Sequence, residues 1–139
     1  MIELDRLRRV PLFGDLDHHD LATIAHHVAE LEVPEGRVLF EEGSIPYELL
    51  IVEEGTAIVT RDGETLGTIG PGDVVGEIAL LRFQRRMATV QTTSPLRALV
   101  LSADDLQVIE VDMPEIVGDL RAIMAARERE DAGGATEPA

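Results

Sequence analysis

The chain has 139 residues, the size of a single domain, and 45% of them are hydrophobic, enough for a core without a metal or disulfide to support it. It has no cysteine, which excludes disulfides, thiolate nucleophiles and cysteine-bound zinc. Its 12 basic residues are all arginine and are outnumbered by 27 acidic residues, so a net charge of -15 repels nucleic-acid phosphates and anionic lipids. We therefore expect no direct nucleic-acid partner and no membrane partner.

The N-terminal segment has a helical pattern. Three apolar residues share one helical spacing before Pro11 ends the run: Leu4, Leu7 and Val10. Asp17 or Asp20 can cap a second helix, whose apolar face extends to about Leu31 and comprises Leu21, Ile24, Ala25, Val28 and Leu31. The first residues do not have the pattern expected of a signal peptide, and no apolar run approaches the ~20 residues that span a bilayer, so we expect a cytoplasmic protein.

From Glu32 to Leu101 glycines recur at short intervals between β-branched segments. Six strands are predicted, at residues 37–40, 49–52, 56–60, 65–69, 87–92 and 97–101. Asp62-Gly63, between two of these strands, is a strong hairpin signal. This rhythm of short strands and glycine turns predicts an antiparallel sandwich or barrel.

The C-terminal part returns to a helical pattern. Ser102 is a candidate helix cap, and Pro114 begins a last helix that extends to about Glu130. The apolar stripe of that helix is Ile116, Leu120, Ile123 and Met124. Residues 131–139 lack large apolar side chains, so we predict a disordered tail. The expected fold is therefore α+β, one domain over residues 1–130, with a β roll at about 32–101 and C-terminal helices at about 102–130.

One segment, residues 72–90, has the composition of an anion site. Gly76 permits a tight turn, and the short helical stretch after it would direct the N–H groups of Ile78 and Ala79 outward. Arg86 could clamp the same anion with charge-assisted hydrogen bonds. Glu77 cannot favour an anion, so its expected role is to accept hydrogen bonds from hydroxyl groups. Together these residues indicate a nucleotide with a free 2′-OH.

The same residues resemble the phosphate-binding cassette of cyclic-nucleotide-binding domains, which occur in the catabolite activator protein, in protein kinase A regulatory subunits and in cyclic-nucleotide-gated channels. The cassette-like stretches are residues 76–81 and 86–90, and further matches lie at residues 11–13, Gly36, Phe40, Gly43, residues 51–55 and residues 70–73. The resemblance implies a jelly-roll-like double-stranded β-helix with C-terminal lid helices. It also implies a ligand site formed by Gly76, Glu77, Ile78, Ala79, Arg86, Met87 and Ala88.

In this resemblance Glu77 accepts from the ribose 2′-OH, while Arg86 and the amides of Ile78 and Ala79 bind the cyclic phosphate. Three positions depart from the family pattern, namely Val75, Arg85 and Met87. Relatives selective for cyclic GMP tend to place a hydroxyl residue at the position of Met87. We therefore expect cyclic AMP as the ligand in preference to cyclic GMP, with no other cofactor.

Two other interpretations remain open. Glu77 and Arg86 could form only a surface ion pair, or the domain could have lost its ligand and act as a protein-interaction or dimerisation module. An enzyme is not expected, because no nucleophile–base pair and no metal-ligand set is present. The histidines, His18, His19, His26 and His27, are interpreted as a solvated or interface helix face.

The expected function is therefore non-catalytic sensing of a cyclic mononucleotide, with movement of the C-terminal helices over the base. About 38 residues follow Leu101, too few for a helix-turn-helix unit beyond the lid. The output is expected to pass to a separate effector protein or through a homodimer, unless the chain was cut from a longer one.

Overall fold

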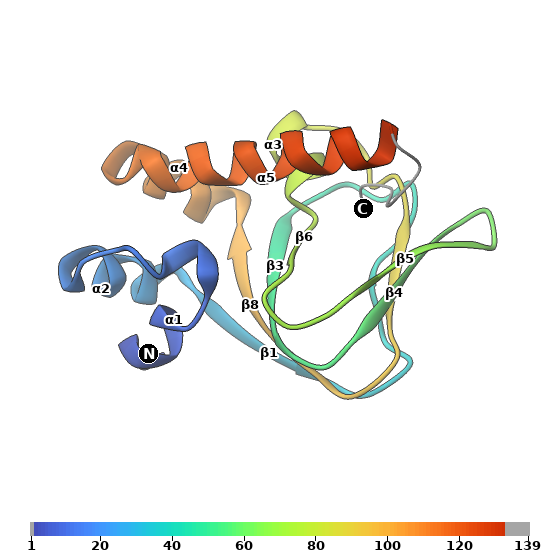
Figure 1. The fold of residues 1–139 in the computed structure, drawn as a ribbon, viewed down its shortest axis with the longest axis horizontal. Coiled ribbons are helices and arrows are strands. Elements are labelled where there is room, and N and C mark those ends of the chain that lie inside the picture. The colour runs from blue at the N-terminus through green and yellow to red at the C-terminus, as the bar shows by residue number, and fades with distance from the viewer. Residues whose placement is uncertain (1, 133–139) are drawn as a thin grey trace.

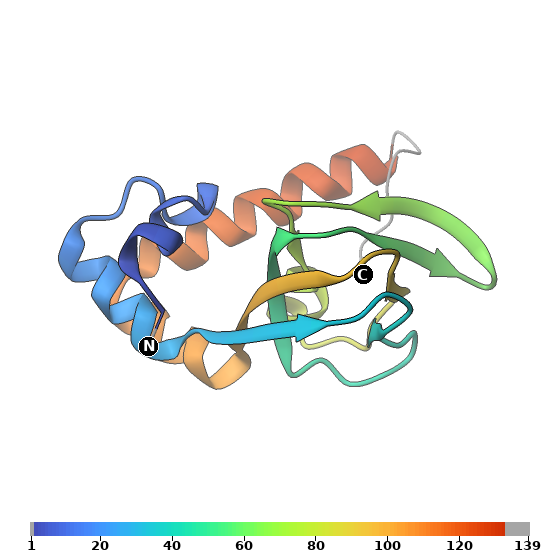
Figure 2. The same ribbon diagram turned by 90° about the horizontal axis from the view of Figure 1, so that it is seen from below.

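The computed structural model describes residues 2–132 and has a β roll with helices gathered at one end of it (Figure 1). The first helices lie beside β1, and the last helix, α5, crosses in front of α3 in Figure 1 and extends over the roll (Figures 1 and 2). The order of elements is therefore helices, roll and helices. The expected α+β fold with an antiparallel β roll is confirmed.

Eight antiparallel strands form two four-stranded sheets with the orders β1-β8-β3-β6 and β2-β7-β4-β5. Their bounds are β1 Ala29–Val33, β2 Val38–Phe40, β3 Glu48–Glu54, β4 Ala57–Arg61, β5 Glu64–Ile69, β6 Val74–Val75, β7 Thr89–Thr92 and β8 Leu96–Ser102. The six strands predicted from the glycine rhythm are all present. Asp62 and Gly63, with φ of 52° and 81°, form the turn between β4 and β5 as predicted.

The helical elements are α1 Leu4–Arg8, the 3₁₀ turn η1 Pro11–Phe13, α2 His18–His27, α3 Glu77–Arg82, α4 Ala103–Asp112 and α5 Pro114–Ala132. Asp17 is the N-cap of α2, where its side chain accepts a hydrogen bond from the N–H of Asp20 at 2.8 Å. Ser102 caps α4 in a reciprocal capping box with Asp105. Both predicted caps thus begin helices.

The prediction of a helix up to about Leu31 is wrong. The second helix ends at His27, and residues 29–33 form strand β1, which pairs with β8 from Ala29 opposite Val100 to Val33 opposite Leu96. The sequence Ala-Glu-Leu-Glu-Val alternates with period two as well as continuing the helical stripe. Pairing with strand β8 stabilises the extended conformation, so the segment forms a strand and not a continuation of the helix. The two-residue strand β6 was also not predicted.

Strand β3 is buried on both faces and separates two hydrophobic clusters. Leu49 and Ile51 belong to a cluster with the N-terminal helices, α4 and α5, whereas Leu50 and Val52 face the interior of the roll. Alternate residues of one strand therefore link the roll to the helices. Any shift of these helices must repack against β3 and β8.

The last helix packs by its first turns. Ile116, Val117 and Leu120 are buried, which agrees with the predicted stripe as far as Leu120. The side chains of Ile123 and Met124 lie outside the described residues, as do residues 133–139 of the predicted tail, while Asp131 and Ala132 belong to α5. Within residues 2–132, the helices are all too short or too polar to cross a membrane.

Candidate functional site

The cassette begins at Gly76, between strand β6 and helix α3. Gly76 has φ of 88° and ψ of 4°, a left-handed conformation that glycine adopts easily. A Cβ atom there would lie 2.5 Å from Arg86 Nη1 and 2.7 Å from the ring of Phe40. Both the backbone conformation and the packing therefore require glycine at the start of α3.

Helix α3 presents its first turn where the cassette prediction placed it. The N–H groups of Ile78 and Ala79 are in this turn, which has no intrahelical acceptors for them, and Gly76 has no side chain to cap them. The side chains of both residues are buried, so α3 is held firmly against the roll. Its N-terminal amides are the kind of donor that an anion accepts.

Arg86 lies at the centre of the site and is 3% exposed. Its Nη1 donates to the carbonyl oxygen of Gly76 at 2.8 Å, and its Nη2 donates to the carbonyl oxygen of Glu48. The guanidinium carbon lies 3.7 Å from the centroid of the Phe40 ring, a cation–π contact. Main-chain bonds fix the same residue, since Arg86 N donates to Ser44 O and Gly43 N donates to Arg86 O.

Glu77 is fully buried within the same site. Burial lowers the pKa of Arg86 to about 10, although the charges of Glu48 and Glu77 act in the opposite direction. The two carboxylates thus only partly compensate the cost of burying the guanidinium. An additional anion beside Arg86 would favour its charged form further.

The structure brings the predicted site residues together, since the cassette is one continuous turn, helix and strand entry. Ala88 is buried, and Met87 is partly buried with its sulfur in contact with Gln84 Nε2 at 3.3 Å. Arg85 differs from Arg86 because it is exposed and donates to the carbonyl oxygen of Gly43 at 2.8 Å. Only one of the two neighbouring arginines therefore points into the site.

Sequence reasoning assigned no site role to Phe40 or Glu48, which contact Arg86 through its ring face and its carbonyl oxygen, respectively. Phe40 reaches the site because β2 pairs with β7, where Phe40 lies opposite Val90. A separation of 46 residues gives no local signal of this contact. In the sequence, the one indication that Phe40 matters was its match to the pattern of cyclic-nucleotide-binding domains.

The histidines do not gather into a metal site. His18, His19 and His26 are exposed on α2, whereas His27 Nδ1 lies 3.1 Å from Asp105 Oδ1. Among residues 2–132 no group of three histidine or carboxylate side chains could hold a metal ion. In the described part of the chain, the histidine face therefore contributes an inter-helix contact between α2 and α4.

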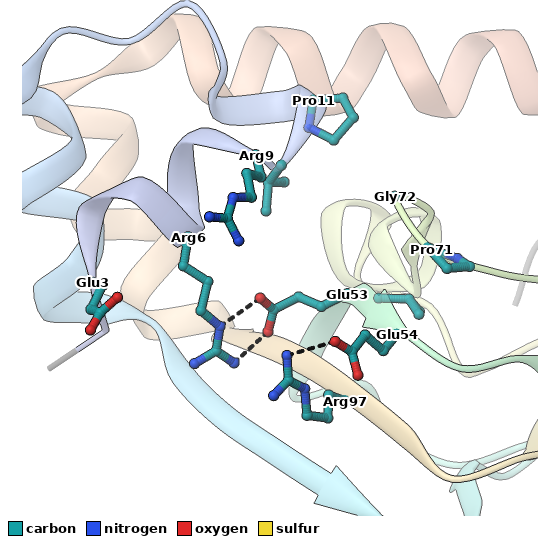
Figure 3. A pocket seen from close by; sticks show the side chains of 11 residues that line it. Glu3, Arg6, Arg9, Pro11, Glu53, Glu54, Pro71, Gly72 and Arg97 are labelled. Atoms are coloured by element: carbon teal, nitrogen blue, oxygen red, sulfur yellow. Dashed lines mark hydrogen bonds and ion pairs between the residues drawn. The ribbon is translucent and has the colours of Figure 1, made fainter.

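A cavity of about 430 Å³ lies away from the cassette, between α1, the turn at Pro71-Gly72 and the outer side of β3 and β8. Figure 3 shows Arg6 pointing toward Glu53 and Arg97 toward Glu54 across this cavity. Arg6 holds Glu53 with two hydrogen bonds, of 2.6 Å from Nε and 2.5 Å from Nη2, and it also pairs with Glu30. These ion pairs fasten α1 to the roll.

Curated proteins with sequences similar to this chain include regulatory subunits of protein kinases. The chain is 33% identical over 103 residues to the cAMP-dependent protein kinase regulatory subunit of Yarrowia lipolytica. This matched stretch covers 73% of this chain and 28% of that protein. The chain spans about a third of the length of the curated relatives it matches first.

Solved structures show the same fold. The catabolite activator protein of Thermus thermophilus superposes with a TM-score of 0.78 at 27% identity, covering 88% of this chain and 60% of that chain. The regulatory subunit of a cAMP-independent protein kinase A from Trypanosoma brucei has a TM-score of 0.76 at 22% identity, covering 86% and 45% of the two chains. This second likeness concerns the fold alone.

The family model described as "Cyclic nucleotide-binding domain" matches residues 30–109, which include both sheets almost completely and the whole cassette. This match covers more than half of the chain, and the buried cassette arginine and the glycine turn lie inside it. The chain belongs to the cyclic nucleotide-binding domain family.

Proposed function

We propose that this domain binds a cyclic purine mononucleotide, cyclic AMP in preference to cyclic GMP, and acts as a non-catalytic sensor. The observation that carries the proposal is the burial of Arg86 beside the first turn of α3. A guanidinium whose pKa is lowered by burial, next to N–H groups without intrahelical acceptors, favours an anion between them. A cyclic phosphate has the charge and the acceptor oxygens for this position.

In the proposed binding mode the guanidinium of Arg86 shares its donors between the protein and the phosphate. Arginine has five N–H donors in a planar fork, and two carbonyl oxygens accept from its Nη atoms here. Phe40 keeps the guanidinium plane in place through its ring face. Glu77, buried at the start of α3, accepts from the ribose 2′-OH.

The switching step of the proposal involves α5. This helix packs against α3, and its buried residues Ile116 and Leu120 lie in the cluster that β3 and β8 share with the N-terminal helices. A ligand that binds better when α5 covers the base would shift the population toward that arrangement. The change would pass to an effector protein or to a second copy of the chain.

A second candidate function is that of a ligand-free interaction module. It is favoured by the low exposure of Arg86, whose two Nη atoms both donate to protein carbonyls. The protein kinase A regulatory subunit from Trypanosoma brucei, described as cAMP-independent, has a similar fold, so the fold alone does not decide the ligand.

Titration calorimetry with cyclic AMP, cyclic GMP and 5′-AMP separates the two candidates. A sensor binds the cyclic nucleotides more tightly than 5′-AMP, with cyclic AMP tightest. An absence of heat with every nucleotide, while circular dichroism reports a folded protein, supports the interaction module and contradicts the sensor.

A further inference from the structure

The residue that follows the cassette helix, Phe83, is unfavourable where it stands on two independent grounds. Its φ of 55° and ψ of 43° place a bulky side chain in the left-handed region, where glycine is the usual residue at the end of a helix. Its side chain is also 85% exposed. Neither local conformation nor burial within the chain explains a phenylalanine here, which points to a contact with another molecule.

Phe83 borders an apolar groove of about 160 Å³ between α3, α4 and α5. The walls include Leu80 and Leu81 from α3, Leu106 from α4 and Val117 from α5. Gln107, Glu110 and Arg121 also line the groove, and its volume is close to the roughly 150 Å³ of an enclosed apolar cavity that holds one benzene ring. A protruding aromatic side chain thus lies directly beside a hollow that fits an aromatic side chain.

Two other residues with exposed apolar side chains, Tyr47 and Val111, lie next to groove residues along the backbone. Tyr47 is 67% exposed, and its carbonyl oxygen accepts from the N–H of Ala103, a residue that lines the groove. Val111 is 81% exposed and lies one helical turn after the groove residue Gln107. With Phe83, these are the three most exposed large apolar side chains in the described part of the chain.

We propose that a second copy of this chain covers this groove in a two-fold dimer, in which Phe83 of each copy enters the groove of the other. A surface with a projection and a matching hollow side by side is complementary to itself under a two-fold axis. The proposal concerns assembly and does not depend on whether the cassette binds a nucleotide.

Charges on the groove rim favour the same occupant. Glu110 of α4 and Arg121 of α5 both line the groove and are exposed, and neither forms an ion pair with another residue whose side chain is described. A two-fold arrangement can set Glu110 of one copy against Arg121 of the other, twice per dimer. This local complementarity matters because two chains of net charge -15 otherwise repel each other.

Sedimentation equilibrium of the full chain over a wide range of protein concentration tests the dimer. Wild type is expected to have twice the monomer mass of 15.2 kDa at high concentration. Phe83→Gly removes the side chain and accepts the left-handed conformation, so it should weaken dimerisation roughly 30-fold or more. At a low concentration where wild type is monomeric, its melting temperature should be equal to or higher than that of wild type. Val38→Thr changes an exposed apolar residue on β2 and should leave the dimer intact.

A charge exchange tests the orientation of the two copies. Glu110→Arg and Arg121→Glu should each weaken the dimer, and the double variant should recover most of the loss. A wild type that stays monomeric, a Phe83→Gly variant that dimerises as tightly as wild type, or a double variant no tighter than the single ones each overturns the proposal.

Discussion

At Gly76 both the backbone and the packing require the absence of a side chain. Gly76→Ala would place a methyl group against Arg86 and Phe40 in addition to imposing a left-handed conformation on alanine. We expect a loss of unfolding free energy of about 1–2 kcal/mol from the conformation and about 1–3 kcal/mol more from the overlap, measured by urea denaturation.

Gly63→Ala is the matched control for this prediction. Gly63 has φ of 81°, close to that of Gly76, but a Cβ atom there meets no atom within 4 Å. Its substitution should therefore show the conformational cost without the overlap. If both variants lose the same free energy, the close approach of Arg86 to Gly76 does not constrain the cassette.

Glu77 is the residue that should recognise the ribose. If its carboxylate accepts from the 2′-OH, 2′-deoxy cyclic AMP should bind more weakly than cyclic AMP by about 1–3 kcal/mol, because a hydrogen bond to a charged group is lost. In Glu77→Gln the difference between the two nucleotides should shrink. A wild-type protein that binds both nucleotides equally, as measured by calorimetry, leaves Glu77 without this role.

Asp105 should contribute stability that depends on pH. Partial burial alone would raise the pKa of Asp105, but hydrogen bonds from Ser102 and His27 outweigh it and hold this pKa below its usual range. A carboxyl group with a lowered folded-state pKa stabilises the fold above its unfolded-state pKa of about 4 and loses that contribution as pH falls below it. The melting temperature should therefore fall between about pH 5 and pH 3 partly through Asp105.

Asp105→Asn tests this contribution, with the exposed neighbour Asp104→Asn as control. The Asp105 variant should have a shallower fall of melting temperature with acid than wild type, whereas the Asp104 variant should follow wild type. Identical acid profiles for all three proteins would remove Asp105 from the account of acid stability.

At the scale of elements, α5 is the helix expected to respond to ligand. It is anchored by Ile116, Val117 and Leu120, while Gly118 is exposed and lowers helix propensity by about 1 kcal/mol relative to alanine. If α5 closes over the base as proposed, hydrogen exchange over residues 114–130 should slow markedly when cyclic AMP saturates the protein.

Gly118→Ala is a useful comparison for the exchange experiment. A Cβ atom at Gly118 meets no atom within 4 Å, so the substitution should only raise helix propensity. Exchange of α5 should therefore be slower in the variant than in wild type when no ligand is present. Unchanged exchange in α5 of wild type, together with protection of residues 76–86 by cyclic AMP, would mean that ligand binds but α5 is static.

At the scale of the whole molecule, the sequence predicts what depends on local chemistry. The caps Asp17 and Ser102, the Asp62-Gly63 turn and the six principal strands follow from residue types at fixed spacing. Strand β1 was not predictable in this way, because a segment whose pattern fits both periods is decided by its pairing with β8.

The candidate site, too, has a part that the local sequence predicts and a part that only the fold brings together. The cassette from Gly76 to Ala88 is continuous in sequence, so its glycine, its short helix and its arginine could be recognised together. Arg86 also contacts the ring of Phe40 and the carbonyl oxygen of Glu48, and only the pairing of strands distant in sequence brings these residues near it. The groove beside Phe83 is likewise formed by three helices that no local pattern relates.

The central claim is that Arg86 binds the phosphate of cyclic AMP, and the neighbouring arginine offers the direct test. Titration calorimetry with cyclic AMP should show that Arg86→Ala weakens binding by about 2–5 kcal/mol, roughly 30-fold or more, because a buried phosphate loses its charged partner. Arg85→Ala should have little effect, since Arg85 is exposed and donates only to the carbonyl oxygen of Gly43 among the described contacts. Equal losses for the two variants, both folded by circular dichroism, would contradict the account.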